Sequence, residues 1–289
     1  MKTALFRCCV TSMDLGHYET SCDAVLRELG IEVAGVKEFG CCGYPLKNSN
    51  KRAYLLSSAR NLALAEREDL ALLTLCNCCY GSLKHAARTL RENPSLKGSI
   101  NVSLEKEGLW YEGRVEPKHF LQVLHDDIGA EVVRNRLKRT FKGLRIAVHY
   151  GCHILRPSSV VQFDRAFQPT KFDVLVEATG ARSVSWRGKL ECCGSPLMGV
   201  NDELSMDLME KKIAGALEAG ADFICVACPY CQLQFDTVQE MAGRHRNRTR
   251  RVPSVLYQQL LGLCLGLDPG ALGLDRNRLP LDAIERFYA

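Results

Sequence analysis

Short apolar runs alternate with longer segments whose apolar residues recur at helical spacing, and this alternation occurs twice along the chain. The predicted strands are residues 2–7, 31–36, 70–75, 144–150 and 221–227, and the predicted helices are 17–30, 49–68 and 204–219. Strands and helices in this order imply right-handed crossovers between parallel strands. The pattern therefore predicts an α/β fold with a mostly parallel sheet in each half of the chain.

The length of 289 residues suits roughly two domains of about 150 residues each. We place the boundary near Lys142, which gives a first domain over 1–142 and a second over 143–289. Residues 93–116 contain Pro94 and three glycines and predict an irregular connection, and 119–128 return to helix. Beyond Pro253 we expect a helical tail that continues into a segment rich in Gly, Pro and Arg.

Ten of the fifteen cysteines form two sets of five with the same internal order. Each set consists of a lone Cys, a Cys-Cys-Gly and a C-x-x-C. The spacers also match, with 31 and 39 residues between the first two parts and 33 and 34 before the C-x-x-C. The first set is Cys9, Cys41, Cys42, Cys76 and Cys79, and the second is Cys152, Cys192, Cys193, Cys228 and Cys231.

The predicted topology brings each set together. The lone cysteines and both C-x-x-C pairs directly follow predicted strands, and ligands of parallel α/β sheets sit outside the carboxyl ends of the strands. A C-x-x-C that opens a helix has its thiols at the positive end of the helix dipole, which favours thiolates. Vicinal cysteines can reach one centre only from a turn, and Gly43 and Gly194 supply the freedom to make it.

The number of thiols indicates which metal chemistry they serve. A mononuclear zinc site or a cubane cluster needs no more than four thiolates, whereas five suit an extended iron-sulfur assembly in which vicinal thiolates reach different irons. Zinc sites that only hold the fold are an alternative, but they leave at least one cysteine per set without a role. A disulfide framework is disfavoured because a reducing compartment keeps thiols free.

Composition and motifs narrow the remaining classes of function. Residues 1–10 lack a signal-peptide pattern, and the longest apolar stretch, 255–267, is too short to span a bilayer. We therefore expect a cytoplasmic protein without a membrane span. The net charge of +5 is modest, and the basic run at residues 244–251 lacks interleaved aromatic residues. Nucleic acid is therefore not an expected partner. The phosphate-binding and zinc-protease motifs GxGxxG, P-loop and HExxH are absent from the sequence.

The two Cys-Cys-Gly motifs, with the flanking segments LCNCCYGSL and HYGCH, resemble the B subunit of heterodisulfide reductase, a member of the CCG-domain family. The resemblance covers nearly the whole chain. It implies two pseudo-symmetric Rossmann-like CCG domains, each binding a noncubane [4Fe-4S] cluster through its five cysteines. It also implies that the two clusters face each other across a disulfide substrate such as CoM-S-S-CoB.

The implied reaction is two-electron reductive cleavage of a low-molecular-weight disulfide between the two clusters. Because the chain has no ferredoxin-type cysteine run, electrons must come from other proteins, and the resemblance implies a ferredoxin-like C subunit and a flavin-containing A subunit. His153, beside Cys152, is a candidate proton donor to the departing thiolate, or a structural histidine that hydrogen-bonds cluster or backbone. Cys8 and Cys78 stay open as thiols near the clusters. Cys22, Cys225 and Cys264 lie in apolar or helical segments, and we expect them to be buried and without a role. His149 lies deeper in its strand than His153, and we expect a core histidine with satisfied hydrogen bonds.

A second functional class stays open at this point. CCG domains also occur in electron-transfer or docking subunits of other oxidoreductase complexes, including sulfur-metabolism and bifurcating complexes. A relay of this kind would be coloured without disulfide turnover, and a zinc protein would be colourless. Two complete cysteine sets favour the enzyme.

Overall fold

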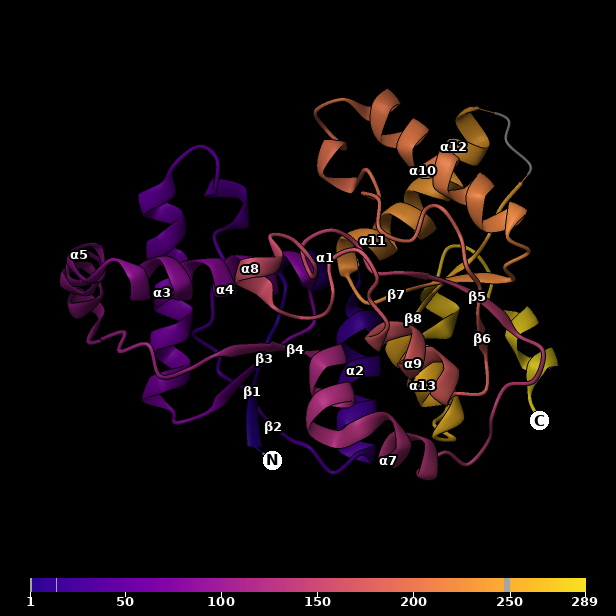
Figure 1. The fold of residues 1–289 in the computed structure, drawn as a ribbon, viewed down its shortest axis with the longest axis horizontal. Coiled ribbons are helices and arrows are strands. Elements are labelled where there is room, and N and C mark those ends of the chain that lie inside the picture. Colours follow the sequence, from indigo (N-terminus) through magenta and orange to yellow (C-terminus); the bar gives the residue numbers. More distant parts are fainter. Residues whose placement is uncertain (1, 14, 247–249) are drawn as a thin grey trace.

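Two parallel β-sheets form the framework of the protein. The computed structural model describes residues 2–13, 15–246 and 250–289. The first sheet has the strand order β2-β1-β3-β4 and the second has the order β6-β5-β7-β8, with every pairing parallel (Figure 1). The strands are β1 (Lys2–Phe6), β2 (Glu32–Ala34), β3 (Ala71–Thr74), β4 (Pro117–His119), β5 (Arg145–His149), β6 (Arg182–Ser183), β7 (Phe223–Val226) and β8 (Ser254–Leu256).

Helices connect the strands in a similar order in both halves. The first half contains α1 (Cys9–Met13), α2 (Gly16–Glu28), α3 (Lys51–Arg67), α4 (Asn77–Glu92), α5 (Pro94–Leu104), α6 (Phe120–Gln122) and α7 (Ala130–Asn135). The second contains α8 (Ser158–Val161), α9 (Lys171–Ala178), α10 (Asp202–Glu218), α11 (Pro229–Leu233), α12 (Gln239–His245) and α13 (Tyr257–Cys264). Short 3₁₀ helices lie at Tyr44–Leu46, Glu105–Glu107, Ser195–Leu197, Leu274–Arg276 and Asp282–Phe287, and π-helical turns at Val123–Gly129 and Gln234–Val238.

The central strands of both sheets are buried runs of mostly apolar residues, as expected for parallel strands covered on both faces. Their registers match, because Phe6 at the end of β1 is level with Thr74 and His149 at the end of β5 is level with Val226. The chain leaves β1 and β3 towards opposite edges of the sheet. The carboxyl ends of these two strands therefore form a switch point, where α/β sheets bind ligands.

The predicted α/β class with parallel sheets is confirmed, whereas the boundary at Lys142 stays a prediction. The prediction of an irregular connection over residues 93–116 is partly wrong, because this segment contains helix α5. The Asn93 side chain caps this helix by accepting a hydrogen bond from the Leu96 amide at 3.0 Å, and Pro94 occupies the first helical turn. The three-residue strands β4 and β8 were also missed, since they are too short to show a period.

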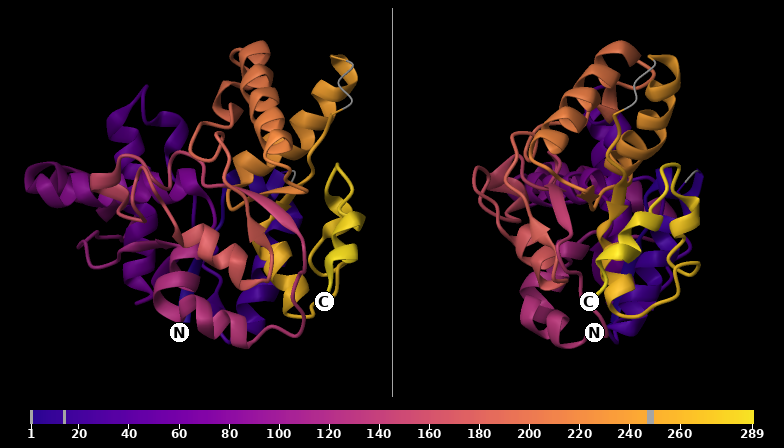
Figure 2. Two further views of the ribbon diagram at one scale, coloured as in Figure 1. Left: turned by 45° about the vertical axis from the view of Figure 1, so that its right-hand side comes forward. Right: turned by 90° about the vertical axis from the view of Figure 1, so that its right-hand side faces the viewer.

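The two halves pack through equivalent helices in an approximately two-fold arrangement. Helix α2, which follows the first strand of the first half, packs on α13, which follows the last strand of the second. Helix α9 of the second half packs on α6 and α7 of the first in the corresponding way (Figure 1). The pair α10 and α12, drawn in orange, stands above the second sheet (Figure 2).

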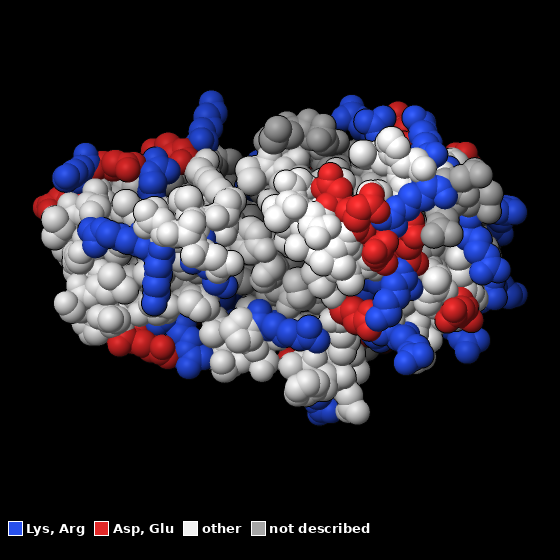
Figure 3. All heavy atoms as spheres, turned by 90° about the horizontal axis from the view of Figure 1, so that it is seen from above, with Lys and Arg blue, Asp and Glu red and all other residues white. Residues whose placement is uncertain are grey.

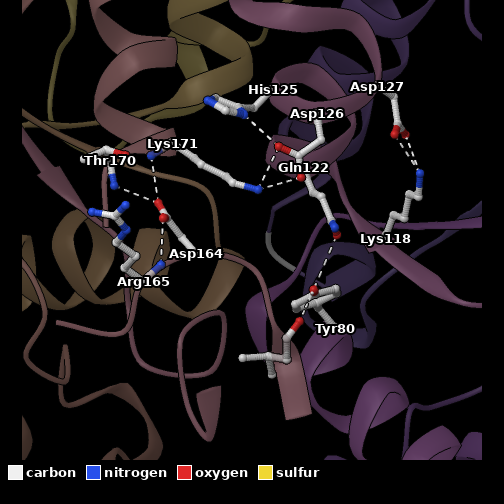
Figure 4. A network of polar contacts seen from close by, with 11 residues as sticks. Tyr80, Lys118, Gln122, His125, Asp126, Asp127, Asp164, Arg165, Thr170 and Lys171 are labelled. Atoms are coloured by element: carbon white, nitrogen blue, oxygen red, sulfur yellow. Dashed lines mark hydrogen bonds and ion pairs between the residues drawn. The ribbon is translucent and has the colours of Figure 1, made fainter. Parts of the chain in front are cut away.

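A polar network also joins the halves (Figure 4). Lys171 at the start of α9 forms an ion pair with Asp126 at 2.6 Å, and His125 contacts the same carboxylate. Tyr80 on α4 donates a hydrogen bond to the Val161 carbonyl at 2.7 Å. Because partly exposed ion pairs contribute only about 0–1 kcal/mol, the network orients the halves more than it stabilises them.

Glu66 on α3 anchors the connection between α5 and β4. Its buried carboxylate accepts hydrogen bonds from the backbone amides of residues 112–115, at distances from 2.6 to 3.2 Å. Four N–H groups directed at one carboxylate hold a loop that has no other regular structure.

We predict that Glu66→Gln lowers the free energy of unfolding by about 2 kcal/mol, because the amide replaces an anion that accepts charge-assisted hydrogen bonds. Glu68→Gln, directly after the same helix, is the matched control, since its half-exposed carboxylate forms a surface ion pair with Arg67. Guanidinium unfolding followed by circular dichroism measures both. Equal midpoints for the two variants would contradict the anchoring role.

Candidate metal centre

All ten cysteines of the two predicted sets lie beyond the carboxyl ends of the strands. In the first half, Cys9 opens α1 after β1, Cys41 and Cys42 precede the 3₁₀ helix at Tyr44, and Cys76 caps α4, whose first turn contains Cys79. The second half repeats this arrangement with Cys152 after β5, Cys192 and Cys193 before Ser195, and Cys228 and Cys231 at the start of α11.

The thiols of each set interact in the same order. The lone cysteine contacts the first member of the vicinal pair, the second member contacts the second cysteine of the C-x-x-C, and the C-x-x-C cysteines contact each other. In the second half, for example, Cys231 Sγ donates to Cys193 Sγ at 3.7 Å. The structure thus brings together each of the two sets that the sequence predicted.

The two sets also meet. The sulfurs of Cys76, Cys78 and Cys228 lie within 4.8 Å of one another, so the C-x-x-C of one half touches that of the other. Asn77 ties the halves together here, because its side-chain amide donates to the Tyr150 carbonyl at 2.8 Å. The approach is close at Gly81, where a Cβ atom would lie 2.9 Å from the His153 carbonyl oxygen. Two centres built on these sets would be neighbours.

Two further cysteines join the first half of the site. Cys8 is buried and its sulfur lies within 4.8 Å of those of Cys76 and Cys79, whereas Cys9 is exposed. Cys78 contacts Cys76 and Cys228. Their positions beside Cys9 and Cys79 in the sequence were the available signal, but adjacency does not show which way a side chain points. Cys22, Cys225 and Cys264 are buried among apolar residues away from these groups, as expected.

Both vicinal pairs sit in the predicted glycine turns. Gly43 and Gly194 have φ of 83° and 93°, and their amides donate to Cys41 Sγ and Cys192 Sγ at 3.4 Å. A Cβ atom on Gly43 would lie 2.8 Å from the Tyr54 carbonyl oxygen. Positive φ and a close backbone contact together require glycine.

Hydrogen bonds between thiols favour one thiolate in each vicinal pair. Cys41 and Cys79 lower the pKa of Cys42, and Cys152 and Cys193 lower the pKa of Cys192. The thiolate is the form that binds metals, so Cys42 and Cys192 are favoured as ligands within their pairs.

His153 lies between the two sets. Its Nδ1 is 3.3 Å from Cys78 Sγ and 3.5 Å from Cys152 Sγ, and its ring packs edge-on against Tyr44 at 5.0 Å. Burial lowers the pKa of His153, and negative charge on the nearby Cys228 acts in the opposite direction. A cavity of about 10 Å³ is lined by residues of both halves, among them Asn77, Cys78, Cys152, His153, Cys228 and Tyr230.

His149 differs from the expectation of a core histidine with satisfied hydrogen bonds. It is buried, and neither ring nitrogen makes a hydrogen bond of good geometry, although the Gly188 carbonyl lies nearby. One ring nitrogen lies within 4.8 Å of the sulfurs of Cys193 and Cys231. The second set therefore has an imidazole at its inner side.

Comparisons with known proteins agree with this geometry. The cysteine-rich domain named CCG matches residues 3–84 and 146–236, which are the two halves of the site. The chain belongs to the CCG family. It is 35% identical to the B subunit of the ferredoxin/F420H2-dependent CoB-CoM heterodisulfide reductase of Methanosarcina acetivorans, over 96% of this chain and 94% of that one.

Two other comparisons broaden the picture. The chain is 34% identical to the 8-methylmenaquinol:fumarate reductase membrane anchor subunit of Wolinella succinogenes, over 95% of each chain. A hypothetical protein from Helicobacter pylori of known crystal structure shares the fold with a TM-score of 0.80 and 21% identity, and this chain spans 53% of its length. Within the described residues, we find no helix with the length and apolar character needed to cross a membrane.

We predict that Gly43→Ala lowers the free energy of unfolding by about 3 kcal/mol, through left-handed backbone strain and a clash with the Tyr54 carbonyl. Gly199→Ala is the matched control, because Gly199 also has positive φ, at 81°, but its Cβ would enter open space. The control should lose only about 1 kcal/mol from strain. Chemical denaturation of both variants measures the difference, and equal losses would mean that the turn tolerates a side chain.

Proposed function

We propose that this chain is the catalytic iron-sulfur subunit of a heterodisulfide reductase-like complex and reductively cleaves a low-molecular-weight disulfide. The observation that carries the proposal is the meeting of two equivalent five-cysteine sets at Cys76 and Cys228. A disulfide has two sulfur atoms, and two facing centres offer one site for each. The similarity to the B subunits of two heterodisulfide reductases supports the same reaction class.

The donor set fits two noncubane [4Fe-4S] clusters. Ten thiols are grouped five and five, and the described residues, which include all fifteen cysteines, contain no disulfide. Soft thiolates are the usual ligands of iron-sulfur clusters. When bound, the clusters supply one-electron chemistry next to the substrate sulfurs. Cys9, Cys41, Cys42, Cys76 and Cys79 would hold one cluster, and Cys152, Cys192, Cys193, Cys228 and Cys231 the other.

The protein's own side chains prepare the site in two ways. Most of the ligand thiols are buried, so the centres are shielded from water on their inner sides. His153 Nδ1 lies at hydrogen-bonding distance from a sulfur of each half, which places it where a newly formed thiolate needs a proton. We propose His153 as this proton donor.

Electrons reach both centres from outside in this proposal. Cys9, Cys41 and Cys192 are exposed, so each centre approaches the surface where a donor can dock. Charged side chains gather on the outer parts of the face seen from above, and a broad area with few of them separates these parts (Figure 3). A ferredoxin-like C subunit and a flavin-containing A subunit are the proposed partners, since several relatives are B subunits of named multisubunit reductases.

We predict about eight irons and eight acid-labile sulfides per chain after anaerobic purification, as two [4Fe-4S] clusters require. Cys42→Ser and Cys193→Ser should each reduce iron to about four per chain, because each removes a ligand from one cluster. Cys264→Ser in the core is the matched control and should retain all the iron. Zinc in place of iron would refute the proposal.

We predict that His153→Gln lowers the rate of disulfide reduction by about 10²-fold or more, because it removes a positioned proton donor. Its iron content should equal that of the unsubstituted protein. His85→Gln on α4 serves as the control and should keep full activity, since His85 contacts Thr89 and Tyr54 rather than a cysteine of either set. A full rate in His153→Gln would assign His153 a structural role instead.

The similarity to a fumarate reductase membrane anchor subunit favours a second candidate. In this alternative the chain relays electrons or docks a complex, and the reaction takes place on another polypeptide. An iron-containing chain that accepts electrons from a reduced donor but cleaves no disulfide in a substrate screen would support the relay.

A further inference from the structure

The two halves hold their vicinal cysteines with different residues at the same position. Asn61 follows the capping Asn50 of α3 by eleven residues, and Lys212 follows the capping Asn201 of α10 by the same number. Asn61 donates to the Cys41 carbonyl at 2.9 Å and accepts from the Gly40 amide at 2.9 Å. Lys212 Nζ donates to the Glu191 carbonyl at 3.2 Å and to that of Gly188. A neutral amide in the first half is thus replaced by an amine in the second.

Lys212 is a buried cation without a matching carboxylate. The residue is only 1% exposed, and its ammonium lies 5.0 Å from the centre of the Trp186 ring. In the part of the chain that the structure describes, no carboxylate forms an ion pair with it. Burial lowers the pKa of Lys212 to about 8, while negative charge at Cys193, Cys231 and Glu191 acts in the opposite direction. A buried charge needs compensation, and the second cysteine set lies beside this one.

A second asymmetry lies at the ends of the first strands. Phe6 ends β1 and His149 ends β5 at the same register position. The Phe6 ring packs on Phe39, whereas the His149 ring packs between Trp186 and Phe235 and one of its nitrogens lies within 4.8 Å of the Cys193 and Cys231 sulfurs. The second half therefore has a polar side chain without a good hydrogen-bond partner beside its thiols, where the first half has a hydrocarbon ring.

We infer that Lys212 and His149 give the second-half centre a higher reduction potential than the first-half centre, so that the first electron delivered by a one-electron donor rests there. The inference builds on the proposed function, because it requires a cluster in each half. Reduction adds one negative charge, and a fixed cation or a hydrogen bond to sulfur stabilises the reduced state more than the oxidised one. Phe6 and Asn61 offer neither to the first half.

The asymmetry gives the reaction an order. With both clusters bound, the first electron from a one-electron donor would rest on the second-half centre, and the first-half centre would require a second electron or a stronger donor. A disulfide between the centres therefore meets one reduced and one oxidised side after the first transfer. Cleavage of the disulfide consumes two electrons, and the one-electron donor supplies them in two successive transfers.

The test is an anaerobic redox titration followed by EPR on the full chain, with dithionite as the reductant. The unsubstituted protein should show two midpoint potentials. Lys212→Gln should lower the higher one alone and reduce the reduced-to-oxidised ratio of that centre about ten-fold at fixed potential, which equals 59 mV for one electron. His149→Phe, which inserts the first-half residue, should shift the same centre in the same direction with its iron retained.

Asn61→Lys is the reciprocal variant and should raise the lower potential while leaving the higher one in place. Full iron with both potentials unchanged in Lys212→Gln and His149→Phe would overturn the inference and leave the proposed function intact. Loss of iron from both variants would assign these residues to holding the loop and would also overturn it. Absence of iron from the unsubstituted protein would overturn the proposed function together with the inference.

Discussion

The parallel pairing of β1 with β3, and of β5 with β7, is the constraint on which the site depends. Each pair ends level, so the segments that leave the two strands start side by side. The lone cysteine follows one strand of the pair and the C-x-x-C follows the other. The strand pairing alone therefore sets the positions of three of the five thiols in each set. The glycine turn then supplies the remaining two. Helix α2 packs on α13 and α9 packs on α7, and this packing brings the carboxyl ends of the strands in the two sheets together, where Cys76 contacts Cys228.

The sequence contained most of this arrangement but not all of it. Apolar periodicity located the central strands and the helices α2, α3 and α10, and the repeated cysteine order predicted both groups of thiols. The three-residue strands β4 and β8 escaped because a period cannot be seen in three positions. Helix α5 escaped because its glycine and proline suggested a loop, although the same proline and the preceding Asn93 are typical of a helix start.

Other features depend on packing that no local pattern reveals. Lys211 and Lys212 are neighbours on α10, and both would be expected to reach solvent. Lys211 does so, with a 71% exposed side chain that lies near Glu191, whereas Lys212 is enclosed beside Trp186. Cys8 and Cys9 show the same difference, since the buried member faces Cys76 and Cys79. Helix rotation and loop closure decide such cases.

The exchange of helix contacts between the halves has a consequence for how this fold is assembled. Each half covers an apolar helix face of the other in a two-fold arrangement, which is the packing of a closed dimer within one chain. A separated half would expose the face of α2 or of α13 and would lack the opposite thiols. The covalent connection through residues 136–144 keeps one copy of each half together at all concentrations. The connection also allows the two halves to differ in sequence, since a true homodimer must carry the same residue at both related positions. A fused pair can instead have asparagine at one position and lysine at the other, so that its two centres have different surroundings.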